Sequence, residues 1–136
     1  MSYYVLNTNM KTNPCFTEEM LNEHKASAYT DPWNKKIDRL YKGDTVFLYQ
    51  SRTGIVAYGI IDRERETKDR DNKKDEEYYV HLDPFYKLVK PMSAAKMRVL
   101  SDKCPAFRHT LYLLDAKAGE RFVKEIGKNH EPIEKK

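Results

Sequence analysis

Polar and aromatic residues gather at three places where an expected strand or helix begins or ends. Together these residue types support non-covalent recognition of a nucleobase, because aromatic faces stack on a planar base while amides and hydroxyls hydrogen-bond its edge. Two other interpretations stay open: Trp33 as a core residue of its helix, and Asn7 and Asn9 as turn residues. The three groups are Asn7, Thr8 and Asn9; Tyr29, Thr30 and Trp33; and Tyr49, Gln50 and Ser51.

Sequence motifs for catalysis and cofactor binding are missing. There is no GxGxxG or GxxxxGK[ST] phosphate-binding pattern, no HExxH zinc motif and no GxSxG nucleophile turn. Cys104 with His109 is a conceivable nucleophile pair, and His81 with Asp83 a weak acid–base pair, but neither has a supporting signature. We therefore expect a binding protein rather than an enzyme, with no cofactor and no metal.

The positive charge lies outside one polar segment. The 136 residues carry a net charge of +4, whereas residues 62–77 hold six Lys/Arg and eight Asp/Glu, or −2, so the rest of the chain carries +6. A basic body suits contact with phosphates, and the 62–77 segment should lie away from a nucleic-acid face. The residues expected near the backbone phosphates, around the mouth of the base pocket, are Lys35, Lys36, Lys42, Arg52, Arg108 and His109.

No targeting or membrane segment is expected. The first residues, MSYYVLNTN, form neither a basic region nor a long apolar run, and no segment approaches the ~20 apolar residues of a membrane span. The two cysteines, Cys15 and Cys104, have no metal-ligand spacing. We expect a soluble cytoplasmic protein with reduced thiols and no membrane partner.

The N-terminal third predicts a short strand and two short helices. Tyr3 to Leu6 is β-rich, Thr17 suits the start of a helix that runs to about His24, and residues 26–30 form a linker or short extended piece. Asp31 and Pro32 predict the start of a second helix. Aspartate caps free N–H groups at a helix N-terminus, and proline at the first helical position sacrifices no hydrogen bond that the helix needs. The apolar face of this helix comprises Trp33, Ile37, Leu40 and Tyr41.

A hairpin forms the expected centre of the fold. Residues 45–50 (TVFLYQ) and 55–61 (IVAYGII) are nearly continuous apolar runs joined by the turn Ser51–Gly54, which indicates burial on both faces, as in a small barrel with helices outside. Residues 62–77 lack apolar side chains and are interpreted as a loop, a solvated extension of the hairpin.

The C-terminal half supplies the remaining elements. Residues 78–82 and 85–89 read as strands, 93–100 as a short helix and 110–114 as a strand. Asp115 should begin a last helix with Gly119, Phe122, Val123 and Ile126 on one face. We expect one α+β domain over residues 1–128, a pseudo-barrel of five or six mixed strands flanked by three or four short helices, and a frayed tail over 129–136.

The order of these segments resembles the EVE domain and its YTH relatives in the PUA-like superfamily. The segments that carry the resemblance are YYVLNTN, then an aromatic residue before a short helix, then KGDTVFLYQSRTGIVAYGII, and FRHTLYLLDAKAGERFVKEI near the end. The resemblance covers almost the whole chain, and KGDxVFLY is its most specific part. It implies a PUA-like pseudo-barrel with a pocket for a modified base, which is N6-methyladenine in RNA for YTH domains and modified cytosine in DNA for EVE domains.

Carried over by position, the resemblance assigns roles to several of these residues. Asn7, Thr8 and Asn9 fall where YTH relatives have polar residues, Tyr29 falls at the cage tryptophan, and Thr30 at its hydrogen-bonding neighbour. Tyrosine offers a smaller stacking face than tryptophan, and Trp33 is a candidate for the second cage aromatic. Two rivals stay open: an ASCH-like hydrolase or ribonuclease of the same superfamily, which would need Lys, Thr and Glu in one pocket, and a protein-interaction accessory domain.

Overall fold

The two apolar segments expected as a hairpin lie at the centre of the sheet. The protein is described by a computed structural model over residues 2–8, 15–29, 33–70, 72–101 and 110–135. Strand β3 (Thr45–Gln50) pairs antiparallel with β4 (Gly54–Ile61). The alternate residues Val46 and Leu48 of β3 pack in one apolar cluster and Phe47 in another, so the strand is covered on both faces, as its unbroken apolar pattern predicts.

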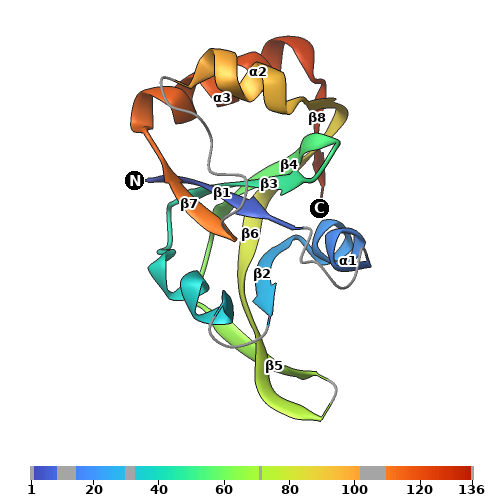
Figure 1. Cartoon of the computed structure of the whole chain (residues 1–136), viewed down its shortest axis with the longest axis vertical. Helices are drawn as coiled ribbons and strands as arrows, with labels where there is room; N and C mark the ends of the chain where they lie inside the picture. Colours follow the sequence, from blue (N-terminus) through green and yellow to red (C-terminus); the bar gives the residue numbers. More distant parts are fainter. Residues whose placement is uncertain (1, 9–14, 30–32, 71, 102–109, 136) are drawn as a thin grey trace.

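Around this hairpin a mixed sheet curls into a half-barrel (Figure 1). Strand β1 (Tyr3–Asn7) lies parallel to β3 and antiparallel to β7 (Leu111–Leu114). On the other side β4 pairs with the long strand β6 (Lys73–Met92), which also pairs with β2 (Lys25–Tyr29). The strand order is β2-β6-β4-β3-β1-β7, which confirms the expected α+β pseudo-barrel.

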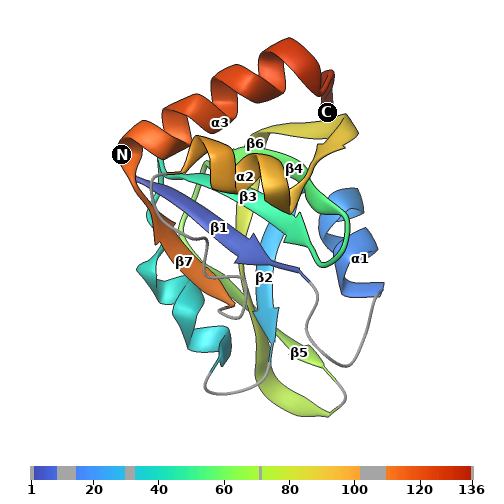
Figure 2. The same cartoon turned by 45° about the horizontal axis from the view of Figure 1, so that its top comes forward.

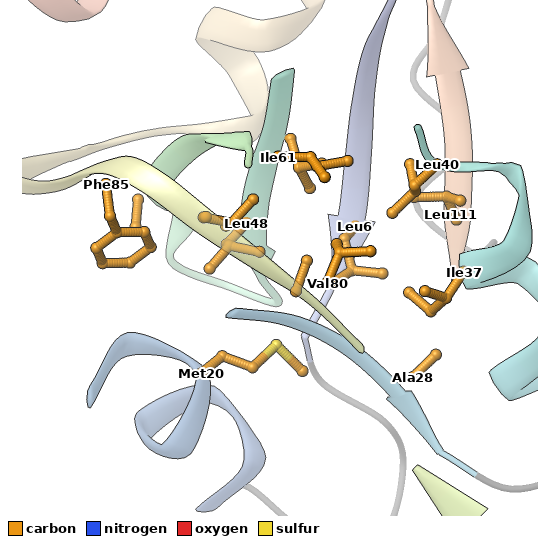
Figure 3. Packing of buried hydrophobic residues seen from close by; sticks show 14 of the residues in the cluster. Leu6, Met20, Ala28, Ile37, Leu40, Leu48, Ile61, Val80, Phe85 and Leu111 are labelled. Atoms are coloured by element: carbon orange, nitrogen blue, oxygen red, sulfur yellow. The ribbon is translucent and has the colours of Figure 1, made fainter. Parts of the chain in front are cut away.

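Two apolar clusters fill the two sides of the sheet. The first lies inside the half-barrel, where Leu6 of β1, Val80 of β6 and Leu111 of β7 converge with side chains from the neighbouring helices (Figure 3). The second, which includes Phe47 and Phe122, lies under two helices on the opposite side. Burial of these side chains supplies the main driving force for folding.

The helices cover these two clusters. Helix α1 (Cys15–Glu23) and the 3₁₀ helix η1 (Trp33–Arg39) contribute Met20 and Ile37 to the cluster inside the half-barrel. Helices α2 (Ala94–Leu100) and α3 (Ala116–Asn129) lie together over the other cluster (Figure 2). Residues expected on the inner face of the last helix, among them Phe122 and Ile126, are buried there.

Two segments have more structure than the sequence indicates. The segment 62–77 extends a hairpin as expected, but as paired strands rather than a loop, because β5 (Glu66–Arg70) pairs with the first part of β6. The expectation of a frayed tail over residues 129–136 is wrong, because β8 (Pro132–Lys135) pairs antiparallel with β6. Both segments are polar and lack an apolar pattern, so their order depends on backbone pairing with β6 rather than on burial.

The expected helix after Asp31 differs from the observed η1 in type and in its apolar face. Residues Trp33–Arg39 form a 3₁₀ helix instead of an α-helix. Ile37 and Leu40 are buried as expected, but the Tyr41 side chain is 71% exposed, so its place on the apolar face is wrong. The helix ends at Arg39, and residues 42–43 then turn the chain into β3.

Candidate nucleic-acid interface

The polar end of β1 meets the end of β3 and the start of β7. Asn7 is the parallel-register partner of Tyr49, and its backbone N–H donates to the carbonyl of Thr110 at 2.8 Å. The Thr8 N–H donates to the Tyr49 carbonyl, also at 2.8 Å. The structure therefore brings together Asn7, Thr8 and Tyr49, which the sequence placed at the ends of two separate strands.

The hydroxyl of Thr8 links β1 to α1. Thr8 is fully buried, and its Oγ1 donates to the Tyr49 carbonyl at 3.1 Å and lies 2.8 Å from Thr17 Oγ1. Because a hydroxyl carries one hydrogen, Thr17 donates to Thr8 when Thr8 donates to the carbonyl. We therefore assign Thr8 to the connection between β1 and α1 rather than to contact with a base edge.

The remaining residues of the third group have different environments. Tyr49 is 6% exposed and packs in the cluster under α2 and α3, so its ring is a core residue and is not available for stacking. Gln50 and Ser51 are half-buried at the end of the β3–β4 hairpin, where Gln50 pairs with Gly54. Arg52 is exposed in this turn with a φ of 68°, a left-handed conformation.

The second group lies where β2 ends and η1 begins. Tyr29 is the last residue of β2, opposite Glu77 of β6, and Trp33 is the first residue of η1; their side chains lie outside the described part of the structure. Lys35 is exposed and Lys36 half-buried on η1, and Lys42 is exposed just beyond it. The other predicted contacts, Asn9, Thr30, Arg108 and His109, fall outside the described residues.

The β5–β6 hairpin packs against η1. The Asn34 amide donates from Nδ2 to the carbonyls of Glu76 at 3.1 Å and Asp75 at 3.4 Å, and Arg65 Nε lies 2.9 Å from Asp38 Oδ1. The hairpin therefore contacts the element that carries Lys35 and Lys36, whereas the sequence led us to expect it away from this face. Long-range hydrogen bonds to a backbone give no signal in the sequence.

One buried acceptor next to the end of β2 has no donor in the part of the chain that the structure describes. Asn34 is 3% exposed, and its Oδ1 has no hydrogen-bond partner in the described structure. The two bonds that Nδ2 donates to carbonyls fix the orientation of the amide, so the oxygen cannot exchange places with the nitrogen. A buried acceptor without a donor costs roughly 1–3 kcal/mol of folding free energy.

A buried ion cluster connects α1, β2 and β6, and sequence reasoning missed it. Lys25 Nζ lies 2.6 Å from Glu77 Oε2 and 3.1 Å from Glu19 Oε1, and Ser27 Oγ donates to Glu77 Oε2 at 2.8 Å. Lys25, Ser27 and Glu77 are at most 3% exposed. Glu77 ends a run of charged residues that reads as solvent-exposed, and its partners are about fifty positions away in the sequence.

Two carboxyl groups beside histidines have shifted pKa values. Burial alone would raise the pKa of Asp62, but hydrogen bonds from His81 and Arg63 outweigh it and hold this pKa below its ordinary value. The pKa of Glu125 is lowered mainly by the hydrogen bond from Asn129, with a smaller contribution from His130, 3.1 Å away. Both carboxylates are therefore charged at neutral pH and hold neighbouring elements together.

In the described ranges, no three His, Cys, Asp or Glu side chains come together as metal ligands do. No helix in that part of the chain is long and apolar enough to cross a membrane.

The comparisons with known proteins give similarities of structure. The sequence matches no protein-family model and no curated protein. Its structure resembles the YTH domain of Mmi1 in complex with RNA, with a TM-score of 0.59 and 11% sequence identity over 93% of this chain and 77% of that one. It also resembles ASCH from Zymomonas mobilis, with a TM-score of 0.55 and 9% identity over 90% of this chain and 94% of that one. Protein PSPTO5229 from Pseudomonas syringae is also similar, with a TM-score of 0.59 and 10% identity over 92% of this chain and 99% of that one. At these identities the similarity shows the fold, which is the one shared by YTH and ASCH domains.

Proposed function

We propose that this chain is an EVE- or YTH-like module that binds nucleic acid and takes one modified base into a pocket near the ends of β1 and β2, without converting it chemically. The observation that carries the proposal is the fold, which matches an RNA-bound YTH domain over 93% of this chain. The basic body supports it, because the chain outside residues 62–77 carries +6.

Recognition of a methylated or hydroxymethylated base would combine an aromatic residue with polar ones. Tyr29, at the end of β2, is the candidate for stacking, which contributes roughly 1–3 kcal/mol per base. A methyl group adds about 0.8 kcal/mol when it is buried, so only a close-fitting aromatic enclosure rewards it. Asn7, which ends β1, and Asn9 and Thr30 remain candidates for reading the base edge.

A fluorescence-anisotropy titration tests the proposal. The probes are short single-stranded RNA and DNA oligonucleotides with one unmodified, methylated or hydroxymethylated base. The parent should prefer one modified probe, and Tyr29→Ala should weaken that binding at least tenfold, or by about 1.4 kcal/mol. The matched control is Tyr41→Ala, because Tyr41 is 71% exposed beside Asp44, whose carboxylate binds Ser2 at the opposite end of β1. Equal loss in both variants would contradict the proposal.

An ASCH-like hydrolase is the second candidate, because the structure brings Lys25, Glu77 and the hydroxyl of Ser27 together. Serine stands where threonine was expected. The group is at most 3% exposed, which favours a structural role and keeps the binding module first. Mass spectrometry of the same oligonucleotides after incubation distinguishes the two: a product of changed mass that Glu77→Gln no longer forms would support the hydrolase.

A further inference from the structure

A hollow on the surface lies between α1 and the C-terminal strand β8. It has a volume of about 230 Å³ and is lined by Leu21 and Asn22 of α1, His24 just after that helix, Lys87 of β6 and Lys135 of β8. Figure 1 shows α1 and β8 on the same side of the molecule. None of these residues belongs to the candidate base pocket.

The lining of this hollow is basic. Lys87 and Lys135 are exposed, and neither forms an ion pair within the described ranges of the chain. No carboxylate is among the lining residues. Two neighbouring acidic side chains do not face the lysines: Glu23 pairs with Lys25 at 3.4 Å, and Glu134, adjacent to Lys135 on β8 and in register with Tyr86, lies on the opposite face of the sheet.

The fold holds the two lysines on one face of the sheet. Lys135 is the register partner of Phe85, and Lys87 follows Phe85 by two positions, so the three side chains point to the same side. The His24 ring stacks on Phe85 with 4.7 Å between centroids and an interplanar angle of 13°. Two ammonium groups placed diagonally on neighbouring strands repel each other unless an anion lies between them.

We propose that this hollow binds a phosphate group. The ammonium groups of Lys87 and Lys135 each offer three donors to phosphate oxygens, and the Asn22 amide adds a neutral donor. The lining is mostly polar, with Leu21 as its one aliphatic side chain, whereas sites for a base or a drug-like ligand are predominantly apolar and aromatic. The tail that the sequence suggested to be frayed has a function in this proposal, because β8 places Lys135 at the hollow.

The source of the phosphate that fits best is the backbone of the nucleic acid, a statement that rests on the proposed function. Helix α1 leads from Thr17, which contacts Thr8 at the end of β1, to His24 at the hollow. Seven residues of α-helix span about 10 Å. A strand with one base in the pocket would therefore carry a nearby phosphate within reach of the hollow. A free phosphate ion would use the same groups.

Amide chemical shifts measured during titrations of the whole chain test the proposal. Inorganic phosphate should shift the amides of Asn22, His24, Lys87 and Lys135, and the double variant Lys87→Ala/Lys135→Ala should abolish these shifts. The charge-matched control is Lys117→Ala/Lys124→Ala on α3, whose lysines are exposed and lie outside the hollow. With a single-stranded oligonucleotide, the salt dependence of the parent should be steeper than that of the Lys87/Lys135 variant by ~0.7, because the variant no longer neutralises the one phosphate that the hollow binds.

The outcomes separate this proposal from the proposed function. Phosphate shifts that depend on Lys87 and Lys135 support the hollow even if no oligonucleotide binds, and the ligand would then be a free phosphate. Oligonucleotide binding that depends on Tyr29 but leaves the hollow amides and the salt slope unchanged supports the base pocket and overturns the nucleic-acid backbone as the source of the phosphate. Phosphate shifts that survive the double variant, or vanish equally in the α3 control, overturn the phosphate site itself.

Discussion

Removal of Lys25 should destabilise the fold more than removal of its partner Glu77. The Lys25 ammonium lies 2.6 Å from Glu77, 3.1 Å from Glu19 and 3.4 Å from Glu23, whereas Glu77 is fully buried. In Lys25→Met, Glu77 loses its cation and retains the Ser27 hydroxyl. In Glu77→Gln, Lys25 keeps two carboxylates, and the amide oxygen still accepts from Ser27.

The expected cost follows from this asymmetry. Removing one member of a buried ion pair costs about 3–5 kcal/mol, and we expect Lys25→Met to reach that range. Glu77→Gln should cost less, about 1–3 kcal/mol, because it weakens one hydrogen bond of Lys25 and leaves no buried charge without a counter-charge. In the double variant neither charge remains, so it should be more stable than the sum of the two single losses predicts.

Urea denaturation followed by circular dichroism measures these free energies of unfolding. The control is Arg65→Ala, which removes an exposed pair with Asp38 and should change stability by at most about 1 kcal/mol. If Lys25→Met unfolds within about 1 kcal/mol of the parent, the cluster does not behave as a buried one. A larger loss in Glu77→Gln than in Lys25→Met would also refute the reasoning.

Two further predictions concern α3 and the response to acid. Gly119→Ala should destabilise the protein by about 1–3 kcal/mol because a new Cβ would lie 2.2 Å from the Tyr3 ring, whereas Gly127→Ala has open space and should stabilise by about 0.5–1 kcal/mol; thermal unfolding checks both. The carboxyls of Asp62 and Glu125 have lower pKa values in the folded state than in the unfolded state. The stability that they contribute is therefore fully present above their unfolded-state pKa of about 4, and it is lost as the pH falls through their folded-state pKa values. Unfolding measured from pH 6 to pH 2 should show this loss, and Asp62→Asn with Glu125→Gln should flatten it.

Elements with strong apolar patterns could be predicted from the sequence. The unbroken run of β3 and the spacing of Phe122 and Ile126 in α3 each indicate an element that the structure contains. In these segments local pattern and tertiary packing favour the same conformation.

Segments that depend on distant partners could not be predicted in the same way. Strand β2 has the sequence KASAY, whose small and polar residues give little β-signal, and it is ordered by pairing with β6. Strands β5 and β8 pair with the same long strand. The candidate site shows the same limit, because Thr8 and Tyr49 are typical polar and aromatic contacts by residue type, but their burial assigns them to structural roles.

The most direct measurement of the central claim is the affinity of Tyr29→Ala for an oligonucleotide with one modified base, compared with the parent and with Tyr41→Ala. The account predicts that the parent prefers the modified probe, that Tyr29→Ala loses at least tenfold in affinity while its unfolding transition is unchanged, and that Tyr41→Ala binds like the parent. Equal binding of the modified probe by all three proteins, or no binding by the parent to any RNA or DNA probe, would contradict it.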